Sequence, residues 1–248
     1  MTKQKAVISL FDLTGYATMP WLELGKVDKA FLLDMQHPQE SIQKQIDKDQ
    51  SVIRISGMAD TWSDSIAFIK ANYQVVFISS FPSCQLLAVS GNRWIKDRLV
   101  SNPNYLEEAM SLVYMARDYA EDQQIPYMIE NPVSLISSQW RKPDYTFHPY
   151  EYGMYLTPEE AEHPLYPDYI QPFDSYTKLT CLWTGNGFVM PTPRPVDKTL
   201  VNGGDQYSLA YRKLGGKSLK TKNIRAATPR GFAKAAAIAN GGVSWWKQ

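Results

Sequence analysis

Two segments of the chain carry side chains that could act together in covalent catalysis. Phe81-Pro82-Ser83-Cys84-Gln85 places a thiol shortly after an apolar run, and Glu130-Asn131-Pro132-Val133 places a carboxylate and an amide after another apolar run, 46 residues later. A loop thiol near a helix end can be a nucleophile, and a carboxylic acid can supply a proton or a strong hydrogen bond. The pair therefore suits nucleophilic catalysis with acid assistance. A third segment, Ser9 to Gly15, is a strand followed by a turn that could hold a cofactor.

Each of these segments also has a purely structural interpretation. A lone cysteine is more often a small buried apolar residue than a nucleophile. An acid followed by Asn-Pro at the end of a strand can simply begin a turn. The strand and turn before Gly15 occur in many α/β proteins that bind nothing there.

The periodicity of apolar residues predicts an α/β fold for the first half of the chain. Strands are expected at 6–11, 29–34, 51–56, 73–79 and 126–130, and helices at 19–24, 63–70 and 104–122. Several of these strands are continuous apolar runs, which is typical of strands that are buried on both faces. Strands that alternate with helices predict a doubly wound, mostly parallel sheet. Ligands of such sheets bind beyond the carboxyl ends of the strands.

The second half of the chain is less regular. Residues 131–197 carry many Pro, Tyr and Trp and few periodic runs, although 174–190 could hold a hairpin around its Asn-Gly pair. Residues 201–222 are rich in Gly, Lys and Ser and are expected to be loop. Periodicity returns at 228–240, which predicts a helix with Thr228 as its N-cap. We therefore expect one α/β domain built from 1–144 and 225–248, with a small irregular insert at 145–224.

The composition is that of an ordinary soluble globular protein. The chain has 248 residues, 44% of them hydrophobic, and a net charge of +1, which neither supports nor excludes nucleic-acid binding. Its two cysteines can form neither a disulfide framework nor a zinc set, so we expect a reduced, cytoplasmic compartment and no metal. The sequence has no apolar run of about 18 residues and no signal-peptide pattern, so no membrane association is expected.

Positive charge is concentrated near the end of the chain. Residues 198–248 contain ten Lys or Arg and a single acid, Asp205. This excess predicts a surface that faces phosphates. The alternative is a solvated loop that contacts no partner.

The order and spacing of the chemical segments resemble the cytosine-5 DNA methyltransferases. Pro82-Ser83-Cys84-Gln85 is similar to that family's Pro-Cys-Gln loop, Glu130-Asn131-Pro132-Val133 to its Glu-Asn-Val motif, and Leu10 to Gly15 to the motif that cradles S-adenosylmethionine. The resemblance covers residues 6–142 and 224–240. It implies a Rossmann-like enzyme that moves a methyl group from S-adenosylmethionine to carbon 5 of cytosine in DNA, of the short, stand-alone kind that bacteriophages carry.

The resemblance also assigns roles to residues. Cys84 would add to carbon 6 of a cytosine taken out of the duplex, Glu130 would act at ring N3, and Arg141, in a segment similar to the family's Gln-x-Arg-x-Arg motif, would assist the base or a phosphate. Asp34 would take the ribose hydroxyls at the end of the second strand, and Asp60 would lie near the adenine. The full set of expected cofactor residues is Phe11, Asp12, Thr14, Gly15, Asp34, Asp60 and Pro82.

DNA is the expected partner, bound by basic residues and by the insert. These basic residues are Arg93, Lys217, Lys220, Lys222, Arg225 and Arg230. The resemblance makes 145–224 the target-recognition region, and Arg225 to Arg230 resembles the segment that packs this region against the catalytic domain. We expect a monomer in the cytoplasm of a bacterial cell or a bacteriophage-infected host.

Two other functions remain open on the sequence alone. An insert of about 80 residues is small for reading several base pairs, so an enzyme of the same fold could instead modify a free pyrimidine nucleotide. In addition, only Gly15 matches a glycine of the family's cofactor motif. The chain could therefore be a binding protein that retains affinity for DNA and no longer holds the methyl donor.

Overall fold

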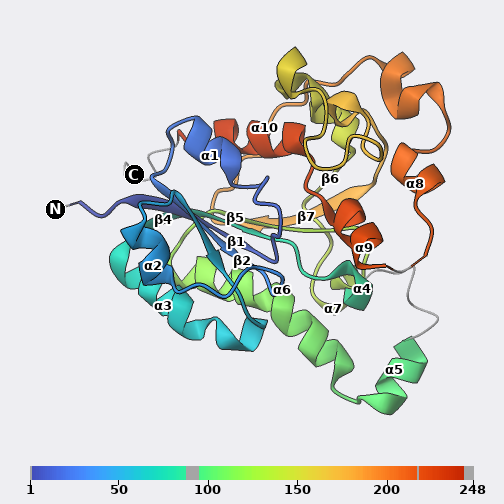
Figure 1. Ribbon diagram of the computed structural model, residues 1–248. Helices are drawn as coiled ribbons and strands as arrows, with labels where there is room; N and C mark the ends of the chain where they lie inside the picture. Colours follow the sequence, from blue (N-terminus) through green and yellow to red (C-terminus); the bar gives the residue numbers. More distant parts are fainter. Residues whose placement is uncertain (1, 88–94, 217, 243–248) are drawn as a thin grey trace.

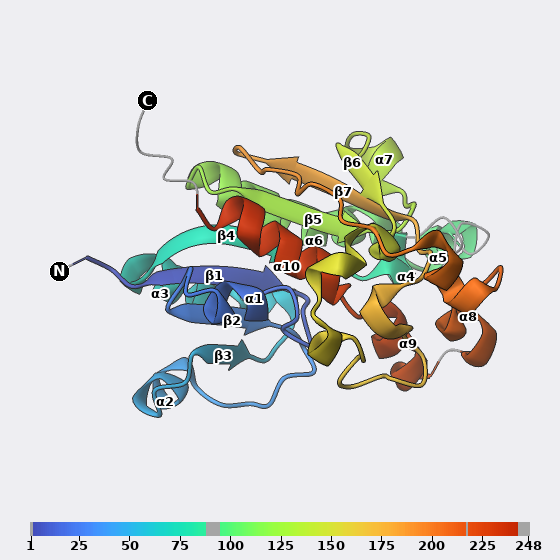
Figure 2. The same cartoon turned by 90° about the horizontal axis from the view of Figure 1, so that it is seen from above.

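The computed structural model describes residues 2–87, 95–216 and 218–242, and its centre is a seven-stranded sheet (Figures 1 and 2). The strand order is β3-β2-β1-β4-β5-β7-β6. The strands β1 to β5 are mutually parallel, whereas β7 is antiparallel to both β5 and β6. They are β1 (Lys5–Leu10), β2 (Lys29–Leu33), β3 (Val52–Ile55), β4 (Gln74–Ser80), β5 (Tyr127–Asn131), β6 (Tyr145–Phe147) and β7 (Thr180–Gly185). The predicted α/β class with a mostly parallel sheet is confirmed, and its switch point lies between β1 and β4.

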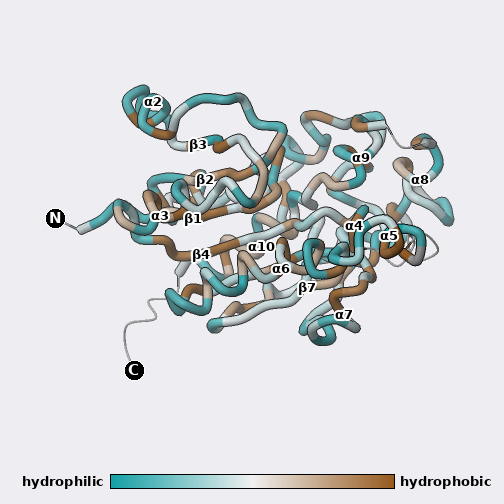
Figure 3. Tube along the Cα trace, turned by 90° about the horizontal axis from the view of Figure 1, so that it is seen from below, coloured by the Kyte–Doolittle hydropathy of each residue, from teal (hydrophilic) through white to brown (hydrophobic). Residues whose placement is uncertain are grey.

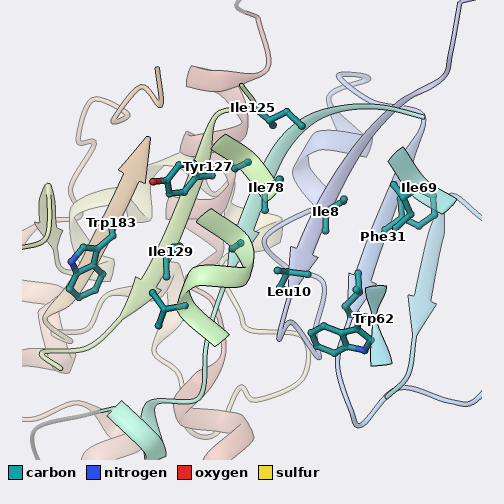
Figure 4. Close-up of a cluster of buried hydrophobic side chains, with 14 of the residues drawn as sticks. Ile8, Leu10, Phe31, Trp62, Ile69, Ile78, Ile125, Tyr127, Ile129 and Trp183 are labelled. Carbon is teal, nitrogen blue, oxygen red and sulfur yellow. The ribbon is translucent and has the colours of Figure 1, made fainter. Parts of the chain in front are cut away.

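Helices cover both faces of this sheet (Figure 1). The helices α1 (Met19–Glu23) and α10 (Arg230–Asn240) lie on one face, and α2 (Ile42–Asp47), α3 (Ser63–Asn72) and α6 (Tyr105–Asp122) lie on the other. Side chains alternate between the faces along each strand. Val7 and Phe77 therefore enter the core under α1 and α10, whereas Ile8 and Ile78 enter the core under α3 and α6. Figure 4 shows this second core, with Trp62 and Trp183 at its borders.

The spacing of apolar residues explains why α6 packs as it does. Its buried residues recur at helical intervals along one stripe. They are Ala109, Met110, Val113, Ala116 and Ala120. The residues on the opposite side of α6 are largely polar. In the tube coloured by hydropathy, the central strands β1 and β4 are brown, whereas the outer helix α2 is largely teal (Figure 3).

The remaining elements are short, and most lie beyond the carboxyl ends of the strands (Figures 1 and 2). They are η1 (Ala59–Thr61), α4 (Cys84–Leu87), α5 (Ile95–Ser101), α7 (Ile136–Gln139), η3 (Pro149–Tyr155), η4 (Pro158–Glu160), η5 (Pro172–Asp174), η6 (Lys198–Gly204), α8 (Leu209–Lys213) and α9 (Leu219–Ala226). The segment 145–224 thus contributes β6 and β7 to the central sheet. The parts of it that lie outside the sheet are 148–179 and 186–224.

Three expectations for the second half are wrong. The predicted hairpin is absent among the described residues, because β7 ends at Gly185 and pairs with β5 and β6 instead. The stretch expected to be loop at 201–222 contains α8 and the first half of α9, whose N-caps are the hydroxyls of Ser208 and Ser218. Thr228 does not cap α10 either.

The carboxylate of Asp174, which is far from α10 in the sequence, caps the start of this helix instead. Asp174 Oδ2 accepts a 2.9 Å hydrogen bond from the backbone N–H of Gly231. Phe173 and Asp174 both have positive φ angles, 56° and 48°, and this unusual backbone turns the carboxylate toward the helix. The insert and the final helix are therefore tied together at this point.

Candidate active site

The carboxyl ends of β1, β4 and β5 bring the three chemical segments side by side. Leu10 is paired with Ser80 in the sheet, and Ser80 is paired with Ile129. The carboxyl ends of these three strands therefore place Phe11, Phe81 and Glu130 side by side. The backbone N–H of Phe81 donates to the carbonyl of Leu10 at 3.0 Å, which keeps the β1 and β4 loops in contact beyond the sheet.

Two hydrogen bonds join the cysteine loop to the end of β5. The side-chain amide of Asn131 donates to the carbonyl of Pro82 at 2.7 Å. The backbone N–H of Leu135 donates to the carbonyl of Leu87, at the end of α4, at 2.8 Å. Pro82 and Asn131 are both buried, so water does not compete for the first bond. The predicted neighbourhood of Cys84 and Glu130 therefore has a specific structural basis.

Glu130 presents a carboxylate oxygen that is not used by the fold. Its Oε1 atom is buried and has no hydrogen-bond partner among the described residues. The Nζ atom of Lys178 lies 3.7 Å from this oxygen, close enough for charge attraction and too far for a hydrogen bond. Three further buried oxygens have no hydrogen-bond partner among the described residues: Asn131 Oδ1 and Ser134 Oγ, which follow Glu130 in the sequence, and Ser80 Oγ, on the strand paired with β5. Unpaired buried acceptors are uncommon in proteins, and their concentration here favours a ligand site.

Cys84 begins the short helix α4 and is exposed as a residue. Loss of solvent around its thiol nevertheless raises the pKa of Cys84, and the carboxylate of Glu130 raises it further. Lys178 and Arg225 act in the opposite direction and lower this pKa. The thiol is thus accessible to a reactant and surrounded by charges of both signs.

The turn after β1 is organised by Asp12. Its buried carboxylate accepts hydrogen bonds from Gly15 N (2.8 Å), Thr14 N (3.1 Å) and Ser9 Oγ (2.9 Å). Burial raises the pKa of Asp12, and these donors partly offset the effect. Gly15 has a φ of 78°, and a Cβ added there would lie 2.8 Å from Leu32 Cδ1, so only glycine fits. Asp12, Thr14 and Gly15 therefore shape the loop, and any contact with a cofactor would come from its outer side.

The other expected cofactor residues are placed as follows. Asp34 directly follows β2, and its Oδ1 atom accepts a hydrogen bond from Gln36 N at 2.8 Å. The ring of Phe11 lies 5.1 Å from that of Trp62, whose Nε1 atom has no hydrogen-bond partner. Asp60 is exposed in η1, after β3. Pro82 is buried in the cysteine loop. Phe11, Asp34 and Pro82 thus follow neighbouring strands, and Asp60 follows the edge strand.

Arg141 is not brought to Cys84 and Glu130. Its Nη1 atom pairs with Asp144 at 2.6 Å, and its Nη2 atom donates to the carbonyl of Thr184 at 2.7 Å. Thr184 is opposite Met128 in the sheet, two residues before Glu130. The expected role of Arg141 at the base or a phosphate stays a prediction; in the structure its guanidinium joins β7 to the residues before β6.

The expected DNA-binding residues fall into two groups within the described part of the chain. Lys220, Lys222 and Arg225 lie on α9, where Lys220 Nζ sits 5.4 Å from the ring centre of Tyr169. Arg230 is more enclosed, and its Nη2 atom donates to the carbonyl of Ala161 at 3.2 Å. Arg93 and Lys217 lie outside the described residues.

A pocket of about 250 Å³ opens between the insert and α9. Aromatic side chains and two cations line it, and we call it the insert pocket. Its lining is Tyr169, Ile170, Tyr176, Thr177, Lys178, Ser208, Ala210, Tyr211, Ile224 and Arg225. Lys178 and Arg225 connect it to Cys84 and Glu130. A wider and shallower hollow of about 670 Å³ lies between α2, α3 and the end of β3, on the far side of β2 from β1.

Sequence reasoning missed Lys178, which has no motif around it. Its only signal is its place before an expected packed strand, and its partner Glu130 lies 48 residues earlier. The described residues contain no cluster of His, Cys, Asp and Glu able to hold a metal ion, and none of the helices described is both long and apolar enough to cross a membrane. No protein-family model matches the sequence, and no curated protein is significantly similar to it.

Proposed function

We propose that this protein transfers a methyl group from S-adenosylmethionine to carbon 5 of cytosine in DNA, through a covalent adduct on Cys84. One observation carries the proposal. The cysteine loop is held against the end of β5 by the bond from Asn131 to Pro82, and Glu130 there has a buried carboxylate oxygen with no hydrogen-bond donor among the described residues. A nucleophile and an acid at one sheet edge, next to the β1 turn, suit this reaction better than a purely structural role.

The reaction requires a thiolate and an acid on one ring. The thiolate of Cys84 adds to carbon 6 while Glu130 protonates or hydrogen-bonds N3, so that carbon 5 gains the electron density of an enamine. S-adenosylmethionine, when bound, supplies the electrophilic methyl group. Loss of the carbon 5 proton then expels the thiolate and restores the ring. Two residues of the chain thus have distinct tasks.

The residues at the ends of β1, β2 and β4 fit a nucleoside cofactor. The Oδ1 atom of Asp34 accepts a hydrogen bond from Gln36 N. An acid at this position is the usual acceptor for ribose hydroxyls in doubly wound folds. Phe11 offers an apolar ring, and Ser80 an unpaired hydroxyl, on either side of the switch point. The mixed sheet is compatible with the methyltransferase fold that the sequence resemblance implies.

Methylation of a free pyrimidine nucleotide is the second candidate. The insert pocket favours it, because about 250 Å³ suits a single small ligand and two cations suit a phosphate. The exposed basic residues of α9 favour DNA instead, since they would extend contacts beyond one nucleotide.

Labelled S-adenosylmethionine tests the proposal directly. The protein is incubated in parallel with mixed-sequence duplex DNA, single-stranded DNA and dCMP, and the nucleosides are analysed by mass spectrometry. We expect 5-methyl-deoxycytidine from DNA and none with Cys84→Ser. Label in dCMP alone would select the second candidate. Absence of label from every substrate, with DNA binding retained, would select a binding protein without methyl transfer.

A further inference from the structure

Lys178 reaches over the end of β5 toward Glu130. It belongs to the segment that leads into β7, and β7 runs antiparallel to β5 with Cys181 opposite Asn131. The residues before Cys181 therefore continue past the carboxyl end of β5. The side chain of Lys178 is 28% exposed and that of Glu130 is 14% exposed, so their 3.7 Å contact is partly shielded from solvent. Such shielding makes a charge pair stronger than one on an open surface.

The thiol of Cys84 belongs to the same group of charges. The hydrogen bond from Asn131 to Pro82 anchors the loop two residues before Cys84. Lys178, before β7, and Arg225, on α9, line the same pocket and lower the pKa of Cys84, whereas Glu130, 3.7 Å from Lys178 Nζ, raises it. One carboxylate and two cations thus surround one nucleophile, each supplied by a different element.

Among the described residues, Glu130 has two further titratable neighbours, Cys181 on β7 and Tyr176 in the insert pocket; burial and Glu130 raise the pKa of Cys181, so it stays a neutral thiol. Burial, Asp174 and Glu130 together raise the pKa of Tyr176 well above its usual value, so it stays a neutral hydroxyl. It adds no charge to the cluster at neutral pH. The balance at the thiol therefore depends on Glu130 against Lys178 and Arg225.

We propose that Lys178 is a positioning residue that holds the carboxylate of Glu130 and favours the thiolate of Cys84 at the same time. The assignment rests on the proposed function, because both effects matter only if Cys84 adds to a base. At 3.7 Å, Lys178 attracts Glu130 Oε1 and leaves it able to hydrogen-bond a ring nitrogen. Lys178 thereby supplies the positive charge that Arg141, paired with Asp144, does not bring to this site.

The rate of alkylation of Cys84 as a function of pH tests this assignment without substrate or cofactor. Iodoacetamide is the probe: the thiolate attacks its methylene carbon and iodide leaves. A Cys181→Ser background leaves a single cysteine, because the chain has only two. In this background Lys178→Met should move the titration of Cys84 to higher pH and slow alkylation at neutral pH by roughly three- to tenfold, since one pH unit changes the thiolate fraction about tenfold.

Paired variants show in which direction each charge moves the titration of Cys84. Glu130→Gln should move the titration to lower pH, and the double variant should return it toward that of the parent. Lys178→Arg should preserve the profile, which separates loss of charge from loss of fold. Lys70→Met is the matched control, because Lys70 is also ion-paired, with Asp122 at 2.8 Å. This pair lies before the amino ends of β4 and β5, away from Cys84. The profile of Lys70→Met should match the parent.

The outcomes separate this inference from the proposed function. An unshifted profile in Lys178→Met overturns the role of Lys178, even in a protein that methylates DNA. A shifted profile in a protein that methylates neither DNA nor dCMP rejects the proposed function and supports the electrostatic role of Lys178. If both hold, the pH dependence of methyl transfer in Lys178→Met should shift in the same direction as alkylation.

Discussion

The side-chain amide of Asn131 donates a 2.7 Å hydrogen bond to the backbone carbonyl of Pro82. This bond joins the residue after Glu130 to the residue two before Cys84. Asn131 is only 1% exposed, so the bond is shielded from water. The loop that carries the candidate nucleophile is therefore anchored to the end of β5 by a buried side-chain amide.

Asn131→Ala should weaken both the fold and the reaction. Removing the amide leaves the Pro82 carbonyl without its buried donor, which typically costs about 1–3 kcal/mol of unfolding free energy. Urea titration measures this loss, and methyl transfer at a temperature where the variant remains folded measures the effect on catalysis. Asn223→Ala is the control, because Asn223 makes a similar 3.0 Å bond to Gln36 at the exposed surface. Equal behaviour of the two variants would remove Asn131 from the organisation of the site.

Cys84→Ser should abolish methyl transfer and change cofactor affinity by no more than a few fold. The thiol contacts the base in the proposed reaction, and the donor lies toward β1 and β2. Calorimetry with S-adenosylmethionine and an activity assay measure the two effects separately. Cys181→Ser is the control, since Cys181 is buried in β7 and should be dispensable for turnover. DNA that contains 5-fluorocytosine should form a denaturation-resistant adduct with the wild type, and its absence would contradict covalent catalysis.

Glu130→Gln keeps the shape of the side chain and removes its acid function. We expect a loss of methyl transfer of roughly 100-fold or more, the usual scale for a general acid or base. Steady-state rates across the pH range check this expectation. Glu107→Gln, on the exposed side of α6, should retain the wild-type rate. A near-normal rate at neutral pH in Glu130→Gln would exclude this residue from the mechanism.

Lys220→Ala combined with Lys222→Ala should weaken DNA binding and its dependence on salt. Each lost phosphate contact reduces the slope of log affinity against log salt by roughly one unit. Fluorescence anisotropy at several salt concentrations measures the slope. Lys44→Ala with Lys48→Ala provides a control of equal charge on α2, where both lysines pair with Glu40. A slope that does not change in the α9 variant would argue against this surface and favour the free-nucleotide function.

His163 should make the fold sensitive to mild acid. Burial and nearby Arg230 lower the pKa of His163 from 6.5 to about 4. The folded state disfavours the protonated ring of His163, so neutral His163 contributes fully to the free energy of unfolding above pH 6.5. This contribution, about 3 kcal/mol in total, is lost as the pH falls from 6.5 toward 4. Thermal unfolding of wild type and His163→Asn at several pH values tests this, and the variant should lose less stability over the interval. His148→Asn should follow the wild-type curve.

Much of the parallel sheet could be predicted from the sequence. Its first five strands are apolar runs bounded by turn residues, and local composition is sufficient to find them. The pairing of β7 was not accessible in this way, because the apolar segment around Cys181 fits a hairpin as well as a sheet interior. Only the long-range contact with β5 decides between them.

The candidate site, like the sheet, could be predicted from the sequence only in part. The sequence motifs around Cys84 and Glu130 lie together at the carboxyl edge, as parallel strands require. Arg141 was assigned by motif alone, and the acid three residues later, Asp144, engages its guanidinium. Lys178 could not be identified from the sequence, because its contact with the carboxylate of Glu130 forms only in the folded chain.

The pairing of β7 on both sides limits how this protein could be recombined. Because β7 pairs with β5, a transplant of 145–224 from another sequence would have to reproduce the β5–β7 register on the host sheet, whereas the β6–β7 register would come with the transplanted segment. A graft confined to 186–224 would leave the sheet intact and still replace α8 and most of α9. The segment that can be exchanged without changing the sheet is therefore shorter than the irregular composition of the chain suggests, and chimaeras should be cut after Gly185.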